Sequence, residues 1–402
     1  MSTKNSGYLG GVLLVAGTCI GAGMIGVPVK TAASGFYPTL IAFVLVLAIM
    51  TMSALLFLEA SLAFPGEINF ISMTKATLGN IAKNIAWAAS LFYMYTIMAA
   101  YTTGGSTMLV EWLPINLYFA ILMYLLPFAV LVYLGTKWLD LVNRFFTIGL
   151  IGSFILLCIS VLIGAHSLQP AVNFSMPFSA MHVIKNLIFA LPLLVTTFGY
   201  HVIIPSLKFY LKENVNVLKK TIIIGGLIPL IVYVVWQVVI LLLIPVFGEQ
   251  GLVSEIFASK NPGNSITNYL IESGQHKSVL VFLFSFMFCA ISSSLIGVSW
   301  ALYDFLADGF KVAKNYIGKL ILISLTFIPP VIYAICFPQG FLKALGLAGA
   351  CSSIIMIVYP ALIVYRLRSK KMTEKYKAPI NKALIVAIAV FGIVVVLLEV
   401  IN

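Results

Sequence analysis

Eleven long runs of the sequence contain no Asp, Glu, Lys or Arg. All but the last reach the roughly 18–25 residues that an α-helix needs to cross a hydrocarbon core about 30 Å thick. Charged residues make up 9% of the chain and hydrophobic residues 61%, whereas soluble domains average about 25% and 45–50%. So few charges cannot cover a water-exposed surface, and the sequence therefore predicts a polytopic membrane protein. The runs are 5–29, 31–58, 84–110, 112–136, 145–184, 186–207, 221–248, 278–303, 320–342, 344–365 and 383–398.

The expected fold is all-α and integral to the membrane, with about eleven transmembrane helices in one polytopic domain, residues 1–402. The longest connection, 247–277, is left open as a cap with a short helix or as a solvated loop. The five cysteines lie inside apolar runs without a C-x-x-C pair, so neither a disulfide nor a zinc site is predicted, and no metal or cofactor is expected. The expected spans are 7–33, 36–64, 80–109, 116–134, 139–165, 183–209, 217–247, 278–306, 316–337, 340–366 and 382–400.

The basic excess of the chain follows membrane topology. The formal net charge is +12, and 19 of the 24 Lys and Arg residues fall in segments on the amino-terminal side of the membrane. This is the positive-inside pattern, so we expect a cytoplasmic amino terminus and a periplasmic carboxyl terminus. The same charge placement argues against nucleic-acid binding. The first apolar run is full length and lacks a small-residue cleavage site, so no cleavable signal peptide is predicted.

The stretch GAGMIG (21–26) matches the dinucleotide-binding fingerprint letter for letter. That fingerprint requires a preceding strand and a following helix, whereas here it lies inside an apolar span. Glycine and proline cost a helix about 1 and 3 kcal/mol relative to alanine. Broken backbone is tolerated in a membrane only where protein or a watery cavity satisfies the freed groups. We therefore predict a break in the first span, which contains Gly17, Gly21, Gly23, Gly26 and Pro28.

A second break is predicted in the sixth span. It carries FGYHVIIP (198–205), in which Gly199 and Pro205 flank His201, the only histidine deep in a span. Spans 1 and 6 open two possible halves of five helices each, and paired interruptions in corresponding helices indicate the substrate site of a transporter. Close helix packing is the alternative explanation for the glycines of GTCIG (17–21), but it does not explain the second break.

Six stretches spread over spans 1 to 10 carry a family resemblance. They are VAGTCIGAGMIGVP (15–28), LVNRFF (141–146), TTFGYHVIIPSL (196–207), IPLIVYVVWQ (228–237), SSLIGVSWALYDFLAD (293–308) and FPQGFLKALGLAGA (337–350). Together they resemble the bacterial hydroxy and aromatic amino acid permeases, and within this family the tyrosine-specific members most. The resemblance implies a leucine-transporter-type 5+5 inverted repeat, with repeats at about 7–165 and 183–366 and an extra helix at 382–400. It also implies that the substrate moves together with a proton.

Backbone groups at the two breaks can hold a zwitterion without a charged side chain. Unwinding at Gly21–Gly23 exposes N–H groups at a positive helix end, which suits a carboxylate. The carbonyls of Phe198 and Gly199 can accept from an ammonium group, and the resemblance makes Phe198 a lid over the substrate side chain. Tyr101 and the serines of span 8 would face the same centre, although a packing role is the alternative for each serine. The predicted substrate-binding residues are Thr18, Ile20, Gly21, Ala22, Gly23, Met24, Tyr101, Phe198, Gly199, Tyr200, His201, Ser293 and Ser294, with Ser292 beside them.

Three ionisable residues inside spans are candidates for the coupling proton: His201, Glu59 and Asp304. Such residues are functional candidates by default, and only histidine has an unperturbed pKa near neutral. The alternatives are a loop Lys or Arg that pairs with each carboxylate, and a hydrogen-bonded histidine that locks the break. Sodium coupling also stays open, since the serines of span 8 and the Ala16–Gly17 carbonyls could supply ligands.

The sequence therefore predicts a secondary active transporter that imports an aromatic amino acid by proton symport across the bacterial inner membrane. Tyrosine is the favoured substrate, with tryptophan or a broader aromatic range as the alternative. A channel is disfavoured because no repeated filter sequence and no ring of charges is found. An enzyme is disfavoured because the four histidines lie on separate segments and form no convergent constellation. The expected partners are the amino acid, the proton and the lipid bilayer.

Overall fold

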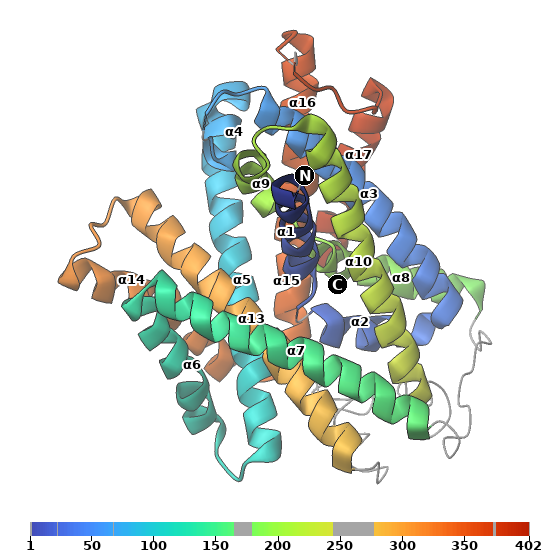
Figure 1. Cartoon of the computed structure of the whole chain (residues 1–402), viewed down its shortest axis with the longest axis vertical. Coiled ribbons are helices and arrows are strands. Elements are labelled where there is room, and N and C mark those ends of the chain that lie inside the picture. Colours follow the sequence, from blue (N-terminus) through green and yellow to red (C-terminus); the bar gives the residue numbers. More distant parts are fainter. Residues whose placement is uncertain are drawn as a thin grey trace.

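The computed structural model describes residues 2–21, 23–66, 68–164, 179–243, 277–372 and 375–401. Within these ranges the chain is helical and contains no strand, as predicted. Figure 1 shows a bundle of long helices, with the short helices α4 and α9 near the end where α16 also lies. The predicted site residue Ala22 and the connection at 247–277, apart from Lys277, lie outside the described residues.

Within the described residues, length and hydropathy give nine spans that can cross a membrane, of which one combines α8 with α9 and another α15 with α16; the bent pair α1–α2 makes ten if it is one span. The remaining expected span, 80–109, is helix α5, which has 33 residues. The helices are α1 (Ser2–Cys19), α2 (Gly23–Thr31), α3 (Phe36–Leu62), α4 (Phe70–Leu78), α5 (Asn80–Trp112), α6 (Leu117–Leu134), α7 (Thr136–Gly164), α8 (Ala180–Thr197), α9 (Ile204–Tyr210), α10 (Val215–Leu243), α13 (Lys277–Phe310), α14 (Tyr316–Cys336), α15 (Phe341–Ser353), α16 (Tyr359–Ser369) and α17 (Lys382–Ile401).

Helix α4 lies in a segment that the sequence analysis left as a connection. Asn69 caps its amino end, because the side chain accepts a hydrogen bond from the Ser72 N–H at 2.8 Å. Its carboxyl end is Gly79, whose φ of +91° lies in the left-handed region that favours glycine. The helix packs against α5 and α16, where it forms part of the cavity described below.

Burial separates the central helices from those that face lipid. The α15–α16 span is 83% buried over its most apolar window, whereas the same measure for α7 is 17%. The exposed side chains of α7 include large apolar ones such as Ile148 and Ile163. An apolar outer surface suits a hydrocarbon solvent, and the chain is accordingly a multi-pass membrane protein.

Packing between the two predicted halves is reciprocal. Helix α5, third in the first half, packs along α15, which opens the fifth span of the second half. Helix α13, third in the second half, packs in the same way along α7, the fifth of the first half. This exchange of partners supports the predicted 5+5 repeat, which otherwise stays a prediction.

Three of the prolines inside spans are Pro28, Pro329 and Pro360, and each frees a backbone carbonyl four residues earlier because proline has no N–H to donate. Each freed carbonyl receives a side-chain donor from a neighbouring helix, as a membrane interior requires. The Trp236 Nε1 donates to the Met24 carbonyl before Pro28 at 2.6 Å, the Tyr95 hydroxyl to the Leu325 carbonyl before Pro329 at 2.8 Å, and the Ser53 hydroxyl to the Met356 carbonyl before Pro360 at 2.5 Å. The last of these carbonyls lies in a π-helical turn, Ile354–Val358, that joins α15 to α16.

Candidate functional site

The first span breaks where the glycines predicted it. Helix α1 ends at Cys19 and α2 begins at Gly23, with a bend of 52° between them. The N–H groups of Gly21 and Gly23 donate to no acceptor in the described part of the chain. Two free N–H groups at the start of a helix are suited to hold an anion.

Two side chains of helix α10 donate hydrogen bonds to backbone carbonyls on either side of this break. The Tyr233 hydroxyl donates to the Cys19 carbonyl at 2.9 Å, at the end of α1. One turn along, the Trp236 Nε1 donates to the Met24 carbonyl at the start of α2. The sequence analysis did not single out these two residues, although Tyr and Trp three positions apart in an apolar helix carry polar tips that need partners.

The sixth span breaks at the other predicted position. Helix α8 ends at Thr197, and a 3-10 turn, His201–Ile203, leads into α9. The carbonyls of Phe198 and Gly199 accept no hydrogen bond from any residue that the structure describes. A Cβ at Gly199 would lie 3.0 Å from the Met356 Sδ, so glycine allows the close approach of this segment to the π-helical turn.

The two breaks lie side by side, together with α13 and α5. A Cβ at Gly23 would lie 2.8 Å from the Thr197 Oγ1. A Cβ at Gly21 would lie 2.5 Å from the Ser294 Oγ of α13, and the Tyr101 hydroxyl of α5 interacts with the same serine. The structure thus brings together both backbone segments and two of the predicted side chains.

The hydroxyl groups of three other predicted residues contact partners outside the two breaks. Thr18 donates to the Leu14 carbonyl within α1 and is exposed. Ser293 donates to the Ala290 carbonyl within α13. Ser292 is fully buried and lies 3.4 Å from the Tyr124 hydroxyl of α6. Their hydroxyls therefore have packing partners in this conformation.

The side chains of Phe198 and Tyr200 both contact α3. Phe198 is fully buried and makes edge contacts with Phe43 of α3 and Tyr233 of α10, at centroid distances of 6.2 and 5.5 Å. The Tyr200 hydroxyl lies 3.5 Å from the Thr51 hydroxyl, also on α3. The Phe198 ring therefore packs between α3 and α10 in this conformation, and its role as a lid stays a prediction.

A cavity of about 680 Å³ reaches from the end of the molecule with α4 to the sixth-span break. His201 and Met356 line it near the break, and Phe57 lies beside them. The His201 side chain is 1% exposed, and neither ring nitrogen has a hydrogen-bond partner among the described residues. The alternative of a histidine locked by its own hydrogen bonds therefore has no support from these contacts.

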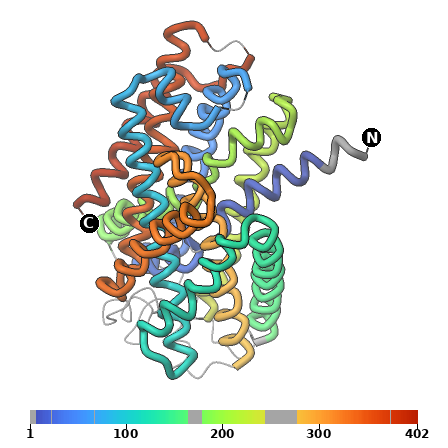
Figure 2. The backbone as a smooth tube through the Cα atoms, turned by 90° about the vertical axis from the view of Figure 1, so that its left-hand side faces the viewer, coloured from blue at the N-terminus to red at the C-terminus, as the bar shows by residue number. Residues whose placement is uncertain are grey.

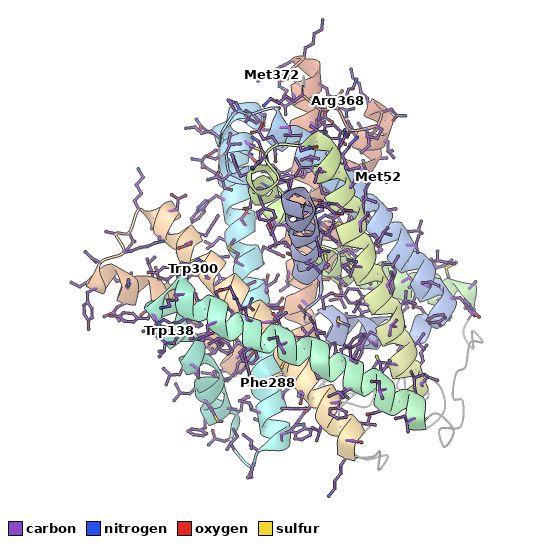
Figure 3. The ribbon with its side chains drawn as sticks, viewed as in Figure 1. Met52, Trp138, Phe288, Trp300, Arg368 and Met372 are labelled. Atoms are coloured by element: carbon purple, nitrogen blue, oxygen red, sulfur yellow. The ribbon has the colours of Figure 1, made fainter. Side chains whose placement is uncertain are left out.

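Both carboxylate candidates are paired, as their alternatives predicted. Glu59 is fully buried and accepts from Arg368 at 2.8 and 2.6 Å, and from the Ala378 N–H at 2.8 Å. Figure 3 labels Arg368 near the carboxyl end of α16. Asp304 pairs with Lys314 at 2.6 Å, and both side chains are exposed. Of the three candidates, His201 alone is both unpaired within the described ranges and next to a break.

Two broken helices side by side within a bundle of membrane-spanning helices are typical of transporters. The tryptophan/tyrosine permease family matches the chain over residues 4–399, and the chain belongs to this family. The resemblance drawn from the six sequence stretches is thereby confirmed.

Some similar proteins are named for tryptophan transport and others for tyrosine transport. The tryptophan-specific transport protein of Pseudomonas aeruginosa is 29% identical, covering 97% of this chain and 94% of its own length. The tyrosine-specific transport system 1 of Haemophilus influenzae is 30% identical, covering 96% and 95%. A solved structure of a manganese transporter from Eremococcus coleocola has a TM-score of 0.62 at 15% identity, covering 98% of this chain and 85% of that one. At this identity the last likeness shows the fold alone.

Proposed function

We propose that this chain imports an aromatic amino acid, tyrosine first, by proton symport across the bacterial inner membrane, with its amino terminus in the cytoplasm. The observation that carries the proposal is the pair of adjacent helix breaks, one with free N–H groups and the other with free carbonyls. A zwitterion needs both kinds of group within a few ångströms, and a backbone site supplies them without a buried charge. Family membership adds the class of substrate.

In this proposal the substrate carboxylate binds the N–H groups of Gly21 and Gly23, and the ammonium group binds the carbonyls of Phe198 and Gly199. The aromatic ring then extends towards Tyr101 and α13. Gly23→Val should abolish substrate binding, because a Cβ there would lie 2.8 Å from the Thr197 Oγ1 and would force apart the two breaks that form the proposed site. Gly17→Val is the matched control in the same span, because a Cβ there meets no atom within 4 Å. Normal uptake by the Gly23 variant would refute this site.

Tyrosine is proposed first because hydroxyl groups meet beside the break, on Ser294 and Tyr101. A site that hydrogen-bonds a substrate hydroxyl rejects the analogue without it far more strongly than a purely apolar site can. Uptake of labelled tyrosine into proteoliposomes, competed in turn with tryptophan and phenylalanine, tests this order. Stronger competition by phenylalanine than by unlabelled tyrosine would contradict it.

His201 is the proposed proton carrier, because it lines the cavity with no hydrogen-bond partner among the described residues and lies beside the carbonyls that would bind the ammonium group. Sodium coupling is the competing mechanism, and one experiment separates the two. Uptake is measured with sodium replaced by choline, with and without a proton ionophore. Proton symport predicts that the ionophore abolishes accumulation and that choline leaves it unchanged; the reverse result supports sodium.

The arrangement of α1 supports an inward-open state under this orientation. In Figure 2, α1 runs outward from the bundle towards the amino terminus, and Leu9 and Leu13 on it are more than half exposed. The cavity opens at the same end of the molecule, where α4 and the start of α5 lie. With a cytoplasmic amino terminus, the path from His201 leads to the cytoplasm.

A further inference from the structure

An aromatic cluster formed by residues of α5 and α13 lines the cavity. Trp87 of α5 stacks on Phe305 of α13, with ring centroids 5.6 Å apart and an interplanar angle of 21°. Phe310 meets the same indole edge-on at 5.7 Å. A Cβ at Gly309 would lie 2.9 Å from the indole ring, so glycine lets the α13 backbone lie close to Trp87. All four residues line the cavity.

Two opposite charges lie one helical turn from this cluster. Lys83 precedes Trp87 by four residues on α5, and Asp308 follows Phe305 by three on α13, so each shares a helix face with its aromatic neighbour. Helix α5 begins and α13 ends near the mouth of the cavity, so both charges lie on the mouth side of the stacked rings. Both line the cavity, and neither forms an ion pair with another described residue.

We propose that this mouth site binds a second aromatic amino acid, with its carboxylate on Lys83, its ammonium group on Asp308 and its ring against Trp87 and Phe305. The chemistry differs from that of the central site, because here side-chain charges hold the zwitterion. A lipid acyl chain fits the flat aromatic wall less well than a ring does. The inference rests on the proposed function for the substrate class. A molecule bound here lies in the release path, so internal substrate inhibits further import.

The test is the binding stoichiometry of purified full-length protein in nanodiscs, measured with labelled tryptophan and tyrosine. We expect two molecules per chain, of which the weaker one is lost in Trp87→Ala and bound about tenfold more weakly in Lys83→Met and Asp308→Asn. Trp112→Ala is the matched control, since Trp112 lies at the other end of α5 against Phe284. Asp140→Asn, in an exposed pair with Arg144, controls for the loss of an acidic charge.

Tryptamine, which lacks the carboxylate, should bind the mouth site more weakly than tryptophan. Its affinity should not change in Lys83→Met. The two charge variants keep the test decisive if Trp87→Ala does not fold. One molecule per chain in the wild type, or two molecules bound with wild-type affinities in every variant that folds, would overturn the mouth site and leave the proposed function intact. Absence of any aromatic amino acid binding would overturn the proposed function itself.

Discussion

A carbonyl inside a membrane needs a donor, and Trp236 supplies one to Met24 where Pro28 cannot. A buried polar group left without a partner costs about 1–3 kcal/mol, so this indole N–H helps to define the direction in which α2 starts. The free N–H groups of the break belong to the same few residues. Trp236 is therefore a positioning residue for the proposed carboxylate site, although it does not touch the substrate.

Trp236→Phe keeps an aromatic ring in place and removes only the donor. We expect a several-fold rise in the KM for uptake, because the start of α2 loses its fixed geometry. Tyr95→Phe is the control, because it removes an equivalent bond to Leu325 far along the sequence from either break. Transport kinetics in proteoliposomes, with a melting curve of each protein, separate the two effects. An equal KM change in both variants would show a general loss of stability instead.

At the scale of the element, the sixth span combines a break with a histidine. His201 lies between α8 and α9, lines the cavity and has no hydrogen-bond partner in the described ranges. In the proposed mechanism this side chain exchanges a proton with the cavity beside the proposed ammonium site. The proposal thus assigns substrate and proton to one short segment.

His201→Gln preserves hydrogen-bonding capacity and removes the ionisable imidazole. We expect the variant to exchange labelled for unlabelled substrate at the wild-type rate. It should fail to concentrate substrate under an imposed proton gradient. Counterflow and gradient-driven uptake in the same vesicles provide the measurement. Wild-type accumulation would rule out His201 as the coupling group.

Helices α3 and α16 are joined by the buried Glu59–Arg368 pair. Glu59→Gln leaves the Arg368 charge uncompensated, and breaking a buried pair in this way costs about 3–5 kcal/mol. The exposed Asp304–Lys314 pair is worth about 0–1 kcal/mol, so Asp304→Asn is the matched control. We expect a large fall in melting temperature for the first variant and almost none for the second. Equal shifts would contradict a structural role for Glu59.

At the scale of the whole molecule, the outward course of α1 (Figure 2) and the cavity along α5 and α13 open the same end of the bundle. Helices α2, α8 and α15, which do not line this cavity, pack against one another. A transporter that alternates its access passes through such a state when it releases substrate. Orientation of the chain then decides which compartment receives it.

Ser206 is exposed and lines the cavity. Ser206→Cys, in a background without the five native cysteines, should react with an impermeant thiol reagent in inside-out vesicles and not in right-side-out ones. Ser106→Cys is the control, because Ser106 is fully buried in α5 and should react in neither. Labelling of Ser206→Cys only from the outside would reverse the proposed orientation or state.

The sequence by itself determined the spans and the two breaks, because both depend on local chemistry. The length of each apolar run sets a helix across a hydrocarbon core, and Gly21, Gly23 and Gly199 weaken a helix wherever it packs. Only the tertiary structure decided which side each broken segment faces. It turned Phe198 towards α3, joined Glu59 to a residue 309 positions away, and placed Trp236 against Met24. Such contacts depend on how helices far apart in the chain pack, which no local pattern records.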